Sequence, residues 1–161
     1  MTGAIFVTGA TGYIGSYVVS ELLRTSDQRL ALLVRAGSQP QARERLWRAL
    51  QLHMQFEEFY ELLSQRVEIH LGDITLPRLG LGLEDFERLA RCIDSVLHIA
   101  ASLNRRSAKA CLNVNLRGTL QVIKLARAAQ DDHGLRRFSD VSTSAVAGRR
   151  SNETVTEDAA I

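Results

Sequence analysis

A glycine-rich turn that follows the first apolar segment constrains the fold of this chain more than any other feature. Residues 4–8 read AIFVT, a short apolar and partly β-branched run that is typical of a strand buried on both faces. The turn TGATGYIG occupies residues 8–15, and residues 13–24 then carry apolar side chains at helical spacing. This strand, turn and helix predict a βα unit in which the N-terminus of the helix binds phosphate groups.

The three glycines of the turn have the spacing GxxGxxG, and each has a distinct expected role. Gly9 permits the tight turn, Gly12 lets a pyrophosphate approach the backbone, and Gly15 lets the helix pack closely on the sheet. A loop that is glycine-rich by chance is the alternative, but the strand–turn–helix context favours a dinucleotide-binding loop. The expected cofactor contacts in this loop are Gly9, Thr11, Gly12, Tyr13, Ile14 and Gly15.

Strand-like and helix-like segments alternate along the rest of the chain. Further strands are predicted at residues 30–34, 67–71, 95–99 and 138–141. Further helices are predicted at 41–64 (one bent helix or two), 83–91 and 109–129, the last with Leu112, Leu116, Leu120 and Ile123 on one stripe. Right-handed crossovers between these strands give an α/β fold, a doubly wound parallel sheet (Rossmann fold) in the order 3-2-1-4-5. Ligands then bind where the order reverses, between the first and fourth strands.

Composition excludes several classes of function. The 161 residues carry 20 basic and 18 acidic side chains spread along the chain, which gives nucleic-acid binding no electrostatic support. No apolar run reaches the ~18 residues of a membrane span, and the N-terminus lacks a basic signal region, so we expect no membrane span and a cytoplasmic location. Neither the histidines nor Cys92 and Cys111 have the spacing of metal ligands, so no metal site is expected, and both thiols are expected to be buried and reduced.

The end of the second strand indicates which dinucleotide is bound. NAD sites usually place an Asp or Glu there, where its carboxylate binds the ribose 2′-hydroxyl. This chain reads LVRAG at residues 33–37 and has no carboxylate in that stretch. Arg35 can instead bind a 2′-phosphate through a bidentate, charge-assisted contact, although a solvated surface arginine is the simpler alternative. Arg45, on the following helix, is a second candidate clamp. The sequence therefore predicts NADP rather than NAD.

The ordered motifs resemble the extended short-chain dehydrogenase/reductase superfamily and, within it, the thioester reductases and fatty acyl-CoA reductases. The matching pieces are TGATGYIG at 8–15, LVR at 33–35, GDI at 72–74 with Pro77 and LGL at 79–81, HIAA at 98–101, NVN at 113–115 with GT at 118–119, and VSTS at 141–144. They cover nearly the whole chain. The resemblance implies one NAD(P)-binding Rossmann domain over residues 1–161.

The resemblance also implies further cofactor contacts. Asp73 and Ile74 match positions that contact adenine, and the alternative for Asp73 is a turn or a helix cap. Ala100 and Ala101 match a pair of small residues beneath the nicotinamide-side ribose and phosphate. Asn115 matches an asparagine that supports the active site, and its alternative is a polar residue that distorts its helix.

Thr143 matches the catalytic Ser/Thr of the superfamily. Its hydroxyl would bind the substrate carbonyl oxygen and stabilise the charge that develops there. The alternative is a strand-end hydroxyl that binds loop backbone. Ser142 is expected among the cofactor contacts, and Ser142 and Ser144 are weaker candidates for the role of Thr143. His98 lies where the superfamily often has His or Asn and is expected beside the cofactor pocket.

The acid of the superfamily is a tyrosine with a lysine four residues later. The spacing YxxxK is absent from these 161 residues. We therefore expect a chain truncated at its C-terminal end, without the last strands and the substrate domain. Such a chain would be inactive, and it would self-associate through the exposed edge of the fifth strand.

The expected parent activity is NADPH-dependent reduction of a carbonyl-level substrate, specifically an acyl thioester reduced to an aldehyde or alcohol. The expected partner is a small-molecule or carrier-bound acyl substrate, and the sequence does not distinguish CoA from a carrier protein. A sugar-nucleotide epimerase or dehydratase is one alternative, which Arg35 disfavours. A non-catalytic NADP-binding or redox-sensing protein is another, which the absent Tyr/Lys pair favours.

Overall fold

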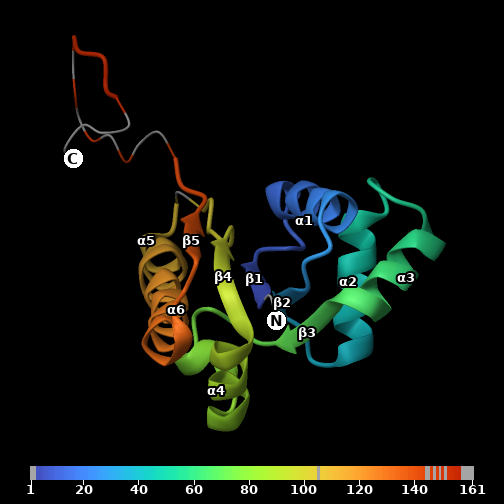
Figure 1. Cartoon of the computed structure of the whole chain (residues 1–161). Coiled ribbons are helices and arrows are strands. Elements are labelled where there is room, and N and C mark those ends of the chain that lie inside the picture. The colour runs from blue at the N-terminus through green and yellow to red at the C-terminus, as the bar shows by residue number, and fades with distance from the viewer. Residues whose placement is uncertain are drawn as a thin grey trace.

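The chain folds into a five-stranded parallel sheet with helices on both faces (Figure 1). The structure, a computed structural model, describes residues 3–104, 106–143, 146, 148, 150 and 152–156. The strand order is β3-β2-β1-β4-β5, which confirms the predicted doubly wound topology. The order reverses between β1 and β4, so the carboxyl ends of these two strands form the expected ligand-binding edge.

The elements alternate as predicted. The strands are β1 (Ala4–Thr8), β2 (Leu30–Val34), β3 (Val67–Leu71), β4 (Ile93–His98) and β5 (Arg137–Asp140). The helices are α1 (Tyr13–Thr25), α2 (Gln39–Leu50), α3 (Phe56–Arg66), α4 (Leu83–Cys92), α5 (Ala108–Cys111) and α6 (Thr119–His133). A 3-10 turn, η1 (Pro77–Gly80), precedes α4, and a π-helical segment, η2 (Leu112–Gly118), joins α5 to α6.

Two apolar cores lie on opposite faces of the sheet. Successive strand side chains alternate between the faces, so Val7 packs in one core and Phe6 in the other, and both are fully buried. The first core joins β1 and β2 to α1, α2 and α3, and the second joins the sheet to α4 and α6. Figure 1 shows these two helix groups on either side of the strands. Burial on both faces explains why β1 and β2 are apolar throughout.

The segment predicted as one bent helix or two is two helices. α2 ends at Leu50, whose carbonyl oxygen accepts hydrogen bonds from the backbone N–H groups of His53 and Met54. This turn buries Met54 in the first core before α3 begins at Phe56.

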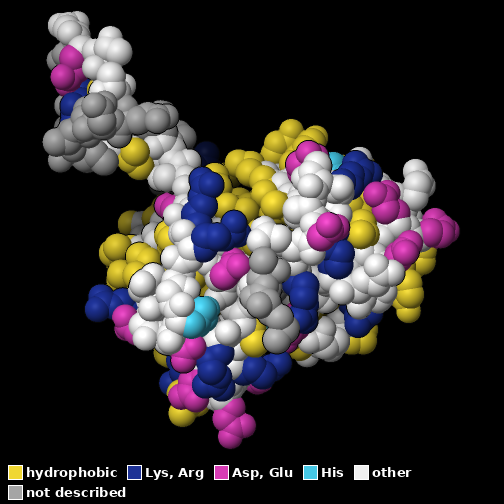
Figure 2. All heavy atoms as spheres, in the orientation of Figure 1, with side chains coloured by type: hydrophobic (Ala, Val, Ile, Leu, Met, Phe, Trp, Pro, Cys, Tyr) yellow, Lys and Arg dark blue, Asp and Glu magenta, His cyan; other side chains and the backbone are white. Residues whose placement is uncertain are grey.

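The expectation that both cysteines are buried is wrong. Cys92 is exposed at the last residue of α4, and Cys111 is half-buried, with its thiol 3.3 Å from the Asn104 carbonyl oxygen. The stripe on the last long helix faces outward, with Leu112, Leu116, Leu120 and Ile123 between 44% and 54% exposed. The inner face is instead formed by Val122, Leu125, Ala126 and Ala129. Figure 2 shows apolar side chains at the surface over this part of the molecule.

Within the ranges that the structure describes, no helix is long and apolar enough to cross a membrane.

Candidate functional site

The glycine loop between β1 and α1 is tightly packed from below and open above. Gly9 has φ +78°, and a Cβ on it would lie 2.7 Å from the backbone nitrogen of Ala100, so the loop passes directly against the turn after β4. A Cβ on Gly15 would overlap the carbonyl oxygen of Gly9, which leaves no room for a side chain between helix and loop. A Cβ on Gly12 would meet only the Gly9 carbonyl oxygen, at 3.2 Å. Gly12 is therefore the glycine on the open side.

The open side of the loop presents backbone donors. The Gly12 N–H binds the Gly9 carbonyl at 2.9 Å, and the first bond of α1 runs from the Ser16 N–H to the Gly12 carbonyl at 2.9 Å. The N–H groups of Tyr13, Ile14 and Gly15 precede that bond, and the first turn of α1 contains no acidic residue. Free N–H groups and the positive end of the helix dipole suit a diphosphate, so this donor set fits the pyrophosphate of a dinucleotide. Thr11 lies half-buried in the same loop.

The ends of β2 and β3 bring a second group of predicted residues together. The Arg35 guanidinium lies 3.7 Å from the Asp73 carboxylate, and the Arg45 guanidinium donates a hydrogen bond to the backbone carbonyl of Arg35. Partial burial opposes ionisation of Asp73, but hydrogen bonds from the Thr75 N–H and hydroxyl, both 2.8 Å, and the nearby Arg35 charge outweigh it and lower the pKa of Asp73. Arg35 itself is 72% exposed and can reach a ligand from this position.

Ile74 behaves differently from its neighbour Asp73. It is only 8% exposed and packs in the second core, where a Cβ on Gly118 would lie 2.9 Å from its Cδ1 atom. Most of its side chain therefore supports the helix that begins at α5, and only a small part faces the loops above.

A buried polar chain crosses the carboxyl ends of β1 and β4. The Thr8 hydroxyl lies 2.6 Å from the Nδ1 atom of His98, and the Nε2 atom of His98 lies 3.1 Å from the Thr119 hydroxyl. The Thr8 hydroxyl oxygen also accepts from the N–H groups of Ile99 and Ala100, each at 3.3 Å. His98 is 2% exposed, so its ring is buried between the Thr8 and Thr119 hydroxyls and does not lie beside the open pocket, where it was expected.

The π-helical segment η2 holds the turn after β4. The Asn115 side-chain oxygen accepts from the Ser102 N–H at 2.7 Å, and the Asn115 side-chain nitrogen donates to the Ser102 carbonyl at 3.0 Å. These two bonds hold the backbone next to Ala100 and Ala101, which are half-buried and exposed respectively. π-helical turns occur frequently at functional sites. Asn115 lies in the distorted part of its helix, and its side chain also holds the loop after β4, so the two roles considered for it are compatible.

Ser142 and Thr143 follow β5 at the same edge of the sheet. The Val141 N–H binds the His98 carbonyl at 2.9 Å, so the segment that carries both hydroxyls is attached to the end of β4. Ser142 and Thr143 are exposed, and the Thr143 carbonyl accepts from the Val146 N–H at 3.1 Å. Ser144 lies outside the described residues.

The predicted site residues thus form three groups at one edge of the sheet: the glycine loop, the Arg35–Asp73 pair, and the ends of β4 and β5. Sequence reasoning missed Thr8, Ser102 and Thr119. A signal for Thr8 was present, because it is a polar residue at the carboxyl end of an apolar strand, directly before the glycine turn.

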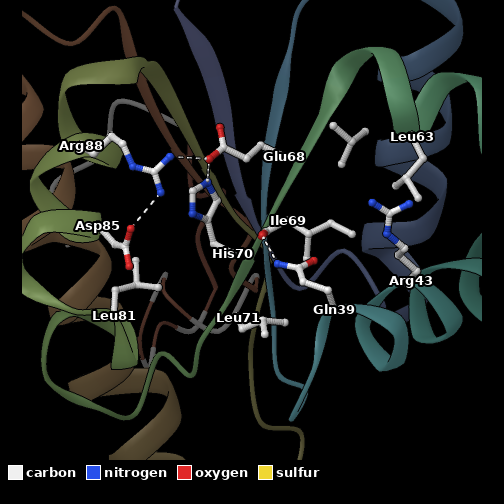
Figure 3. Close-up of a pocket in the computed structure, with 11 residues that line it drawn as sticks. Gln39, Arg43, Leu63, Glu68, Ile69, His70, Leu71, Leu81, Asp85 and Arg88 are labelled. Atoms are coloured by element: carbon white, nitrogen blue, oxygen red, sulfur yellow. Dashed lines mark hydrogen bonds and ion pairs between the residues drawn. The ribbon is translucent and has the colours of Figure 1, made fainter.

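A separate hollow of about 530 Å³ lies along the outer edge of β3. Figure 3 shows four of its side chains in contact with one another: Arg88 contacts Glu68 at 3.1 Å and Asp85 at 2.8 Å, and Glu68 lies 3.5 Å from His70. None of the predicted site residues lines it. Nowhere in the described part of the chain do three or more His, Cys, Asp or Glu side chains converge as metal ligands would.

Comparison with known proteins identifies the family. The NAD-binding family described as "Male sterility protein" matches residues 7–161, and the chain belongs to it. Isonitrile lipopeptide synthase of Mycobacterium tuberculosis is 36% identical over 161 residues, which are 98% of this chain and 6% of that protein. Fatty acyl-CoA reductase 1 of Xenopus laevis is 29% identical over 128 residues, 76% of this chain and 25% of that protein.

Solved structures agree. The reductase domain of a nonribosomal peptide synthetase from M. tuberculosis superposes with a TM-score of 0.79 at 33% identity, over 99% of this chain and 37% of that domain. This likeness and the family confirm the resemblance to thioester reductases and fatty acyl-CoA reductases. The class of protein is therefore a Rossmann domain that binds a nicotinamide dinucleotide and is related to reductases. The chain spans a quarter or less of the two curated relatives and about a third of the solved domain.

Proposed function

We propose that this chain forms the cofactor-binding part of an NADPH-dependent reductase whose substrate is an acyl thioester on CoA or a carrier protein. One observation carries the choice of NADPH. Arg35 occupies the end of β2, where no residue from 33 to 37 is acidic, and its exposed guanidinium lies beside the strand ends that the adenosine would meet. Arg45 supports that loop through the Arg35 carbonyl and lies close enough to act as a second clamp.

The other residues have assigned tasks in this proposal. The N–H groups at the start of α1 bind the pyrophosphate, Asp73 accepts from the adenine amine, and Ala100 and Ala101 admit the nicotinamide ribose. Bound NADPH supplies a hydride to the thioester carbonyl carbon. The Thr143 hydroxyl donates a hydrogen bond to the carbonyl oxygen, where negative charge develops, and Ser142 contributes beside it. The relatives, a lipopeptide synthase and a fatty acyl-CoA reductase by name, support the substrate class.

Cofactor titration tests the first part of the proposal. NADPH and NADH are titrated against the unmodified chain, Arg35→Ala, and Arg43→Ala as the control. Arg43 is an exposed arginine on the same helix as Arg45 and has no hydrogen bond or ion pair among the described residues. A charge-assisted contact to a phosphate contributes roughly 1.5–3 kcal/mol, and the exposure of Arg35 favours the lower end. Arg35→Ala should therefore weaken NADPH about ten- to thirtyfold and leave NADH unchanged. Equal affinities of the unmodified chain for the two cofactors would refute NADPH preference.

Turnover tests the second part in the full-length protein. NADPH oxidation is followed with an acyl-CoA and with the same acyl group on a carrier protein. Thr143→Val should lower kcat by roughly a hundredfold or more, as loss of one oxyanion donor does, while the Kd for NADPH stays the same. Thr143→Ser should retain most of the activity because it keeps the hydroxyl. No turnover with either thioester would rule out this substrate class.

A further inference from the structure

We propose that His98 is a positioning residue for the cofactor site: its neutral imidazole, held in one tautomer, fixes the turn after β4 against the glycine loop. This inference rests on the proposed function for the ligand, NADPH. Nothing in the reaction requires His98 to touch the cofactor or substrate, and at 2% exposure its ring is closed off from both. Its influence passes through the groups that it binds.

The hydrogen bond between His98 and Thr119 can have only one donor, the imidazole of His98. The Thr119 hydroxyl donates to the Asn115 carbonyl at 2.8 Å, one turn earlier on the helix. A hydroxyl has a single proton, so the Thr119 oxygen can only accept from the imidazole. The Nε2 atom of His98, 3.1 Å away, must therefore carry a proton.

The Thr8 end agrees with that assignment. The Thr8 oxygen already accepts from the N–H groups of Ile99 and Ala100, so its proton is free to be donated. The Nδ1 atom of His98 lies 2.6 Å from this oxygen and has no proton in the assigned tautomer, so it accepts. Every donor from the backbone of the turn to the Asn115 carbonyl then has a partner.

The hydrogen bonds from Thr8 through His98 to Thr119 reach the parts of the site that bind the cofactor. The peptide between Ile99 and Ala100, which Thr8 holds, is the one that Gly9 packs against, with its Cβ position 2.7 Å from the Ala100 nitrogen. At the other end, Thr119 binds the backbone of Asn115, whose side chain holds Ser102 through two bonds. The backbone carbonyl of His98 also accepts from the Val141 N–H, next to Ser142 and Thr143. One buried residue thus connects the turn after β4, the segment that contains Asn115 and the residues after β5, which surround the nicotinamide side of the proposed site.

Protonation of the ring would disrupt this arrangement. An imidazolium has a proton on Nδ1 as well, so the Thr8 oxygen would face three donors with two lone pairs, and its own proton would lose its acceptor. Burial lowers the pKa of His98 from its ordinary value of 6.5, and the Asp140 carboxylate on β5 acts in the opposite direction. Thr8 of β1 and the Thr119 and Asn115 groups of the adjoining helix are uncharged. Asp140 is the charged group that influences His98 among the described residues.

Three substitutions test the role through the Kd for NADPH. His98→Phe keeps a ring but removes both hydrogen bonds, and should raise the Kd roughly tenfold at pH 7.5, equivalent to about 1.4 kcal/mol. His98→Gln carries one acceptor and one donor on a planar group and should stay within about threefold of the unmodified chain. Thr119→Val removes the acceptor at the other end and should resemble His98→Phe, which keeps the test valid if the latter does not fold. His133→Phe is the control, because His133 contacts Ile93 at the opposite end of β4.

A pH series separates positioning from space filling. As pH falls from 7.5 through the lowered pKa of His98, the unmodified chain should lose affinity for NADPH more steeply than His98→Gln. The 2′-phosphate of NADPH titrates near about 6 in both proteins, so the ratio of the two Kd values isolates His98. Nitrogen-15 NMR of the imidazole, without cofactor, should show a protonated Nε2 and an unprotonated Nδ1 at neutral pH.

The outcomes are distinct. A proton on Nδ1, or His98→Phe binding NADPH as tightly as the unmodified chain, would overturn the positioning role. A constant Kd ratio across a pH range in which the nitrogen-15 signals show His98 becoming protonated would do so too. If the unmodified chain binds no NADPH at any pH, the proposed function fails, and the NMR result still decides whether the hydrogen-bond chain exists.

Discussion

Substitution of two glycines in the same loop should separate binding from folding. Gly12→Val places a side chain on the open side of the loop, where the backbone has φ −87° and ψ 172°, a region open to any residue. Its Cβ would lie 3.2 Å from the Gly9 carbonyl oxygen, so the loop must move by only a few tenths of an ångström. We expect a stability loss of no more than about 1 kcal/mol, which lowers Tm by roughly 2–4 °C in a domain of this size.

The binding effect of Gly12→Val should be far larger. The valine would occupy the space through which the pyrophosphate approaches the N–H groups at the start of α1. Loss of two charge-assisted hydrogen bonds, at roughly 1.5 kcal/mol each, weakens binding by more than about a hundredfold. The measurement is a thermal melt with and without NADPH. The unmodified chain should gain about 2.7 kcal/mol of stability at a ligand concentration 100 times the Kd, and Gly12→Val should gain none.

Gly15→Ala is the matched comparison. Its methyl group would overlap the Gly9 carbonyl oxygen and lie 3.1 Å from the Cα of Ala10. Overpacking of this kind destabilises by about 1–3 kcal/mol, which exceeds the helix propensity gained on replacing glycine. Gly15→Ala should therefore melt below Gly12→Val in the absence of cofactor. A folded Gly12→Val that binds NADPH with unchanged affinity would refute our placement of the pyrophosphate.

The ionisation of Asp73 and the apolar surface of the chain should both have effects that are measurable in solution. The pKa of Asp73 is lowered in the folded chain, so its ionised form contributes stability above the ordinary pKa of 3.8, and this contribution is lost as pH falls through the folded value. The difference in unfolding free energy between the unmodified chain and Asp73→Asn should therefore shrink below pH 4. A constant difference would contradict the contacts assigned to Asp73. Among the described residues β5 pairs only with β4, so its outer edge and the exposed leucine stripe should make the chain associate. Light scattering should show a mass that rises with concentration and falls in Leu116→Gln, whereas a monomer at all concentrations would contradict this.

The sequence predicted the fold well because its local signals agree with one another. β1 and β2 are apolar runs between glycine turns and amphipathic helices, and an alternating βα pattern leaves few topologies open. The glycine loop was predictable for the same reason, since its spacing, its preceding strand and its following helix all point to one structure. Asp73 and Arg35 were predicted separately, and the adjacency of β2 and β3 then brings them together.

What the sequence did not predict depends on contacts between distant segments. The Arg45 side chain binds a backbone carbonyl, and carbonyls have no sequence signature. The outward direction of the Leu116 and Leu120 stripe follows from packing of the opposite face of α6 against the sheet, although both faces are apolar in sequence. The π-helical segment has no characteristic composition. The Thr8–His98 contact was closer to prediction, because both are polar residues at the carboxyl ends of neighbouring strands.

The π-helical segment η2 makes the number of residues between Cys111 and Thr119 a structural constraint in its own right. A residue added to or removed from a helix rotates everything beyond it by about 100° and shifts it by about 1.5 Å. The half that contains Thr119 is fixed against the sheet through His98, while the half that begins at Ser107 ends the loop after β4. Substitutions at exposed Leu112 or Leu116 leave these halves in phase. A single insertion or deletion would rotate one half against the other, so this short stretch should tolerate substitutions at its exposed leucines but no change in its number of residues.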